Sequence, residues 1–206
     1  IEDALALVVD LVREGELPKA MAICDRILAI APEHPDALHY KGMAHYQAGN
    51  RNEAVALIWR ALQASPRYTA AWNNLGNILS IADLHDKAEE AYRRVIALDP
   101  NHADGWNNLA ASLKELGRLP EAEAAVRKAL ELAPEHRDAH NTLGNILRKQ
   151  GRDGEALDAF RRAVALHPQT PEAYRALASV LYAVGQVEEA ALVYRRWLEV
   201  DPGNVY

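Results

Sequence analysis

The sequence contains very little cysteine. Cys24 is the single cysteine among 206 residues, so no disulfide can form within the chain. A chain without disulfides must be held by a packed apolar core and is compatible with a reducing compartment, so we predict a cytoplasmic location. Cys24 falls at an apolar position, which favours a small buried hydrophobe over a reactive thiol.

Excess positive charge and long apolar runs are also missing. Lys and Arg total 23 against 29 Asp and Glu, which gives a formal charge of -6. General binders of nucleic acid or anionic membranes need a net basic surface, so neither partner is predicted. No apolar run reaches the roughly eighteen residues of a membrane-spanning helix, and the first residues lack the basic region of an export signal.

The motifs of common catalytic and cofactor sites are absent. The chain contains no phosphate-binding GxxxxGK, no GxGxxG, no GxSxG and no CxxC sequence. His136 and His140 have the spacing of two metal ligands on one helix face, but no third ligand completes an HExxH pattern. We therefore predict that the chain is not an enzyme and uses no cofactor or metal.

Most of the ten prolines and eleven glycines recur at fixed spacing. Six prolines lie 34 residues apart without an insertion: Pro32, Pro66, Pro100, Pro134, Pro168 and Pro202. With Ile1 as position 1 of a 34-residue unit, glycine occupies position 15 in every unit except the third, which has Asp83. The repeat units are 1–34, 35–68, 69–102, 103–136, 137–170 and 171–204. A repeat of this length predicts a solenoid.

Each unit has the pattern of two helices. Apolar residues recur at helical spacing, as in Leu109, Leu113 and Leu116. We expect helix A over about positions 2 to 14 and helix B over about positions 18 to 31, with the position-15 glycine left-handed between them. Small residues at positions 8 and 20 should let the two antiparallel helices approach closely.

The third unit shows the family resemblance most fully. Its matching residues are Trp72, Leu75, Gly76, Ala88, Tyr92, Val95 and Pro100. This pattern at period 34 resembles the tetratricopeptide repeat, and the resemblance extends over all six units. It implies an all-α fold, a right-handed superhelical solenoid of six antiparallel helix-turn-helix units in a single array. The departures lie mainly in the first unit, with Ala4, Val8 and Cys24, and at Lys41, which takes a leucine position.

The resemblance also implies a concave groove lined by helix A. In this family, positions 2, 5, 9, 12 and 13 form its floor. The predicted peptide-binding residues are His39, Met43, Tyr46, Asn73, Asn77, Asn107, Lys114, Asn141, Asn145, Arg148, Arg175 and Tyr182. This floor changes from apolar to amide-rich to basic along the chain. An extended peptide with an apolar part and an acidic part is the predicted partner.

Asparagine recurs at equivalent floor positions. Asn73, Asn107 and Asn141 all occupy position 5. A ladder of amides supplies donors and acceptors that can hold a peptide backbone, and these repeats are similar to those of O-linked N-acetylglucosamine transferases, whose groove asparagines grip the substrate backbone. The alternative is that each amide bonds a neighbouring helix.

Three functions fit the pattern. The first is a noncatalytic scaffold that binds a peptide or helix of a partner in the groove. The second is a substrate-recruiting region of a larger enzyme of the glycosyltransferase or methyltransferase type. The lack of an initiating methionine and of polar caps leads us to expect a segment of a longer protein. The third is self-association through the array ends, with Leu5, Leu7, Val8, Leu11 and Val12 as the apolar face.

Overall fold

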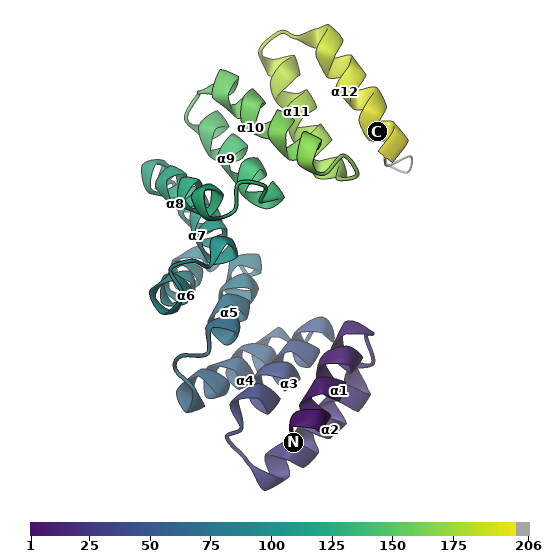
Figure 1. Ribbon diagram of the computed structural model, residues 1–206, viewed down its shortest axis with the longest axis vertical. Coiled ribbons are helices and arrows are strands. Elements are labelled where there is room, and N and C mark those ends of the chain that lie inside the picture. Colours follow the sequence, from purple (N-terminus) through teal and green to yellow (C-terminus); the bar gives the residue numbers. More distant parts are fainter. Residues whose placement is uncertain (201–206) are drawn as a thin grey trace. The chain divides into compact units, whose positions relative to one another are not determined.

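The computed structural model describes residues 1–200, and within that range it contains twelve α-helices and no strand (Figure 1). Six helices form a compact unit over residues 1–100: α1 (Glu2–Arg13), α2 (Leu17–Ile30), α3 (Pro35–Gln47), α4 (Arg51–Ala64), α5 (Thr69–Ile81) and α6 (His85–Leu98). The other six belong to a second unit that begins at Asn101: α7 (Ala103–Glu115), α8 (Leu119–Leu132), α9 (Arg137–Lys149), α10 (Asp153–Leu166), α11 (Pro171–Ala183) and α12 (Val187–Val200). Pro202, the last of the regularly spaced prolines, lies outside the described residues.

The helices pack as consecutive hairpins within each unit (Figure 1). In the first unit α1 pairs with α2, α3 with α4 and α5 with α6, while α2 contacts α3 and α4 contacts α5. In the second unit α7 to α12 repeat the same pattern, and α9 also contacts α7 and α11. This packing confirms the predicted all-α solenoid of helical hairpins within each unit. Helix B begins at position 17, one residue earlier than predicted.

The turn within each hairpin is fixed by a residue in the left-handed conformation. The position-15 glycines have φ between +75° and +84°, as the sequence predicts. Asp83 occupies the same place in the third repeat with φ of +58°. A side chain with a Cβ is strained in this region, whereas glycine enters it freely. The third hairpin therefore carries a local strain that the other five avoid.

Replacing Asp83 with glycine is expected to raise the free energy of unfolding by about 0.5–1 kcal/mol, because it removes the left-handed strain. Urea denaturation followed by circular dichroism measures the change. The reciprocal control, Gly151→Asp, introduces the strain at the same turn position of the fifth repeat and should be destabilising. A loss of stability in the Asp83→Gly variant would contradict the prediction.

The hairpin core depends on a size exchange between positions 8 and 24. An added Cβ at Gly144 would lie 2.7 Å from the Phe160 ring, and one at Gly76 would lie 2.6 Å from the Tyr92 ring. Glycine at position 8 therefore makes room for the large residue on helix B. In the first hairpin Val8 faces Cys24, and both are fully buried in one cluster with Ala20. The two departures from the family pattern compensate each other, since a larger residue meets a smaller one.

The apolar face predicted for self-association on α1 is partly wrong. Val8 is buried against α2, and Leu11 and Val12 are half-buried against the same cluster. Leu7, on the other side of the helix, is 50% exposed. The predicted residues therefore divide between the hairpin core and the surface, because a helix cannot present residues 7, 8, 11 and 12 on one free face while it packs against α2.

Two further sequence features are explained by their contacts. Cys24 is buried, as predicted, and burial raises the pKa of its thiol to about 11, which keeps it protonated at neutral pH. Lys41 replaces the usual leucine at the edge of the helix pair, where its ammonium group lies 2.6 Å from the Asp25 carboxylate. Over residues 1–200, no helix has the length and apolar character required to cross a bilayer.

Candidate functional site

In the first unit, most of the predicted groove residues are half-buried beside the core. Met43 and Tyr46 on α3 are half-buried and pack against the cluster formed by α4 and α5. Asn73 on α5 is half-buried as well. Asn77 accepts a hydrogen bond of 2.8 Å from the Tyr92 hydroxyl, so its amide oxygen is already engaged by helix B of the same repeat. For Asn77, the alternative in which the amide bonds a neighbouring helix is the one observed.

His39 is the most buried of the predicted groove residues, with 3% of its surface exposed. Its Nε2 lies 2.9 Å from Asn74 Nδ2, and its Nδ1 lies 3.1 Å from the Tyr68 hydroxyl. The Asn74 amide is a donor, so Nε2 accepts and the proton resides on Nδ1. Burial lowers the pKa of His39 to about 4, against the opposing effect of the nearby Asp36 carboxylate. His39 is thus a neutral connection between the second and third repeats rather than an exposed floor residue.

In the second unit, α7 offers little free polar surface. Asn107 is 7% exposed, and its Nδ2 makes only a long contact of 3.4 Å with Asn108 Oδ1. Lys114 lies 2.7 Å from the Glu115 carboxylate, which Lys149 also approaches to 3.4 Å. The hydrogen bond from Lys114 lowers the pKa of Glu115, partly opposed by burial. Both lysines are therefore paired with Glu115, which balances one of their two positive charges.

Four predicted residues come together between α9 and α11. Asn141, Asn145 and Arg148 of α9 and Arg175 of α11 line one cavity of about 320 Å³. Its remaining lining residues are Glu172, Ala176 and Ser179. Spacings of four and three residues place the α9 side chains on one face of the helix. Tyr182, the last predicted residue, is 65% exposed and lies outside this lining.

The polar groups of this cavity, here called the α9–α11 site, are available for a ligand. Within residues 1–200, the side chains of Arg148 and Arg175 form no ion pair or hydrogen bond. Asn141 Oδ1 is buried without a hydrogen-bond partner. Asn145 occupies the same repeat position as Asn77, but the residue across its hairpin is Phe160, which has no hydroxyl to engage it. The site therefore presents two guanidinium groups and two amides beside one carboxylate.

The histidines that hinted at a metal site are used structurally. His136 Nδ1 accepts from the Ala139 amide at the start of α9, and its Nε2 lies 2.8 Å from Asp104 Oδ1. His140 Nε2 donates to the Pro134 carbonyl at 2.9 Å. Each ring is therefore held by its own turn or its own repeat. In the described part of the chain, no group of three His, Cys, Asp or Glu side chains is placed to hold a metal.

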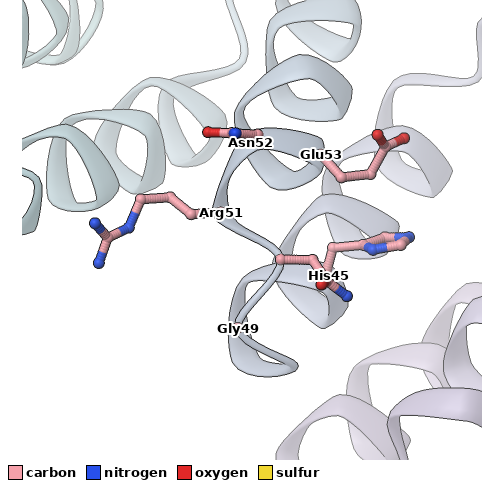
Figure 2. A pocket seen from close by; sticks show the side chains of 6 residues that line it. His45, Gly49, Arg51, Asn52 and Glu53 are labelled. Carbon is pink, nitrogen blue, oxygen red and sulfur yellow. The ribbon is translucent and has the colours of Figure 1, made fainter.

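A larger but shallow depression of about 690 Å³ lies at the turn between α3 and α4. His45, Asn50, Arg51, Asn52 and Glu53 line it together with Gly49. Figure 2 shows that the Arg51 side chain extends away from those of His45 and Glu53. Because its charged groups diverge, this depression is a weaker candidate than the α9–α11 site.

The sequence and the fold place this chain among known repeat proteins. Family models described as tetratricopeptide repeat match residues 11–78, 69–102, 107–171 and 141–205. No curated protein matches the chain in sequence. Among solved structures, pilF of Pseudomonas aeruginosa has a TM-score of 0.85 at 16% identity, covering 98% of this chain and 92% of its own.

Two further solved structures show the same fold. PilW, a type IV pilus biogenesis factor, has a TM-score of 0.74 at 27% identity over 81% of this chain and 77% of its own. YrrB, a repeat protein with an unusual peptide-binding site, has a TM-score of 0.66 at 16% identity over 88% and 93%. The six units, their hairpin packing and the matching family models together show that the chain belongs to the tetratricopeptide repeat family, whose arrays are scaffolds for protein interaction.

Proposed function

We propose that the chain is a noncatalytic scaffold that holds a peptide segment of a partner protein, with the α9–α11 site as the anchor for a carboxylate of that segment. The observation that carries the proposal is the convergence of Arg148 and Arg175 on one cavity, where neither guanidinium group has an ion-pair partner among residues 1–200. An unpaired guanidinium fork matches the geometry of a carboxylate and can bind it in bidentate fashion.

The amides of the site specify how the peptide would lie. Asn141 Oδ1 is a buried acceptor without a donor, and a peptide N–H would satisfy it. Asn145 has both a donor and an acceptor to offer and can hold the next peptide unit. Glu172 also lines the cavity, so its carboxylate and the two guanidinium groups leave a net charge of +1, which suits one ligand carboxylate. The preferred ligand is therefore an extended segment with one acidic side chain or a terminal carboxylate.

Removal of both guanidinium groups tests the proposal. Twelve-residue peptides selected from a random display library on the native chain would be synthesised and titrated by calorimetry. For the acidic peptides, the Arg148→Ala/Arg175→Ala variant is expected to weaken binding at least about tenfold, because each charge-assisted hydrogen bond contributes roughly 1.5–3 kcal/mol. Asn145→Ala should weaken binding by a smaller factor.

The neighbouring lysines provide the matched control. Lys114→Ala/Lys149→Ala removes two cations that are both already paired with Glu115, so the affinity for the same peptides should change less than about threefold. If the lysine variant loses as much affinity as the arginine variant, the attraction is a general effect of positive charge and the proposed anchor is wrong. If no selected peptide depends on Arg148 or Arg175, the site does not bind peptides.

A further inference from the structure

Among residues 1–200, an ion pair joins position 21 or 25 of one repeat to the next repeat at three of the four junctions within the two units. Asp25 pairs with Lys41 at 2.6 Å, Glu123 with Arg152 at 2.7 Å and Arg161 with Glu189 at 2.9 Å. In each pair the first partner occupies position 21 or 25 of one repeat, and the second belongs to the next repeat. The second partners occupy positions 7, 16 and 19, so the pairs share only the charged residue at position 21 or 25 that bonds across the junction.

The junction between the second and third repeats has no charged residue at position 21 or 25. Its position-25 residue is Trp59, whereas the other five repeats carry a charge there: Asp25, Arg93, Arg127, Arg161 and Arg195. Position 21 is Val55. Trp59 is 48% exposed, so nearly half of a large apolar side chain remains in water. Hairpin packing does not require a tryptophan at this position, because charged residues fill it in every other repeat.

The exposed ring forms one wall of a groove, here called the Trp59 groove. Val55 and Trp59 of α4 and Trp72, Leu75 and Leu79 of α5 line an opening of about 490 Å³. The two tryptophan rings meet edge to face, with centroids 5.6 Å apart. A smaller cavity of about 100 Å³ lies along the same ring pair, beside Leu62. The groove therefore has room for an apolar side chain, with a second small recess beside it.

The walls of the Trp59 groove are held in place by the core. Trp72 Nε1 donates to the Pro66 carbonyl at 3.0 Å, which fixes the ring. Val55, Trp72 and Leu79 pack against the buried cluster that contains Leu75. A partner would find these walls already formed, and preorganised walls reduce the entropy cost of binding.

The rim of the groove, on α6, carries two cationic side chains. Lys87 and Arg94 line the opening, and neither forms an ion pair with any of residues 1–200. Glu90 lies between them on the same helix face, so the rim has an excess of one positive charge. A carboxylate of the partner could therefore form an ion pair with Lys87 or Arg94 without displacing a partner within the fold.

We propose that the Trp59 groove is a second docking site, for a segment of a partner protein in which a large apolar side chain is flanked by aspartate or glutamate. The apolar side chain packs against Trp59 and Trp72, and the flanking carboxylate pairs with Lys87 or Arg94. Three other junctions carry an ion pair from position 21 or 25, whereas this junction has the half-exposed Trp59 ring, which a partner can cover. This site uses residues of α4, α5 and α6 in the first unit and shares no residue with the α9–α11 site.

A variant that removes the Trp59 groove can be copied from another junction of the same array, where the same positions are compatible with the fold. Trp59→Arg/Lys87→Glu copies the Arg161–Glu189 pair, because these residues occupy the same two positions at the junction of the fifth and sixth repeats. The variant should therefore fold and unfold like the native chain. Random twelve-residue peptides displayed on phage would be selected on the native chain and on this variant, and peptides enriched only on the native chain would be titrated by calorimetry.

The expected peptides carry a large apolar residue flanked by Asp or Glu, and the double variant should weaken their binding at least tenfold. Arg148→Ala/Arg175→Ala should change their binding less than threefold, which separates this site from the α9–α11 site. The proposal is overturned if no selected peptide depends on Trp59, or if the dependent peptides are basic. It is also overturned if light scattering shows a native dimer that the double variant converts to monomer, since a second copy would then occupy the groove.

Discussion

Replacing Gly144 with alanine is expected to lower the free energy of unfolding by about 1–3 kcal/mol, although alanine is the better helix former. In an open helix interior the substitution would gain up to about 1 kcal/mol. At this position the new Cβ would lie 2.7 Å from the Phe160 ring, which is fully buried. Overpacking of this kind typically costs 1–3 kcal/mol. Urea denaturation of the native chain and the variant measures the difference.

The fourth repeat shows how the cost can be removed. There, position 8 is Ala110 and position 24 is Val126, and both are fully buried. In a Phe160→Val background, Gly144→Ala should therefore cost little or become stabilising, which a double-mutant cycle would report as a strong coupling. Gly154→Ala is the control, because no atom lies within 4 Å of its added Cβ. An equal cost of Gly144→Ala in both backgrounds would show that the Phe160 contact is not its cause.

The fold could be predicted because its determinants are local and repeat in step. Proline at position 32 and glycine at position 15 mark the ends of each helix, and both depend only on backbone conformation. Small residues at position 8 correctly indicate close helix contact. The size exchange between positions 8 and 24 is also visible in the sequence. The first repeat combines the larger Val8 with the smaller Cys24, and the fifth combines Gly144 with Phe160.

The candidate site was harder to predict, because exposure at a groove position depends on a residue elsewhere. Asn77 and Asn145 share position 9, yet only Asn77 is bonded by the residue across its hairpin, since Tyr92 has a hydroxyl and Phe160 does not. His39 shares position 5 with three asparagines but is covered through its contacts with Tyr68 and Asn74. Repeat position alone does not distinguish a free amide from an engaged one.

Trp59 was missed because the pattern of the family contains no rule for position 25. A search for motifs finds what each repeat shares, whereas this site arises where one repeat differs from the other five. Reading each position down the six repeats would have found it, as a tryptophan among charged residues. The structure adds what such a comparison cannot, namely that Lys87 and Arg94 line the same groove.

Acidification from pH 7.5 to pH 4 is expected to destabilise the native chain by roughly 3 kcal/mol more than a His39→Asn variant. The ordinary pKa of histidine is 6.5, and burial lowers that of His39 to about 4 in the folded chain. Below pH 6.5 the unfolded chain gains a proton that the folded chain does not accept until about pH 4. The stability from this group is thus fully present above pH 6.5 and is lost as the pH falls toward 4, at about 1.4 kcal/mol per pH unit.

The His39→Asn variant isolates this effect because asparagine occupies the same repeat position at Asn73, Asn107 and Asn141. It should be less stable than the native chain at pH 7.5, since it loses the connection between Tyr68 and Asn74, and its stability should fall less with acid. Urea denaturation at a series of pH values gives the difference between the two curves, in which groups common to both chains cancel. Parallel curves would mean that His39 accepts its proton as readily in the folded chain as in the unfolded one. That result would contradict a buried, neutral imidazole holding the second and third repeats together.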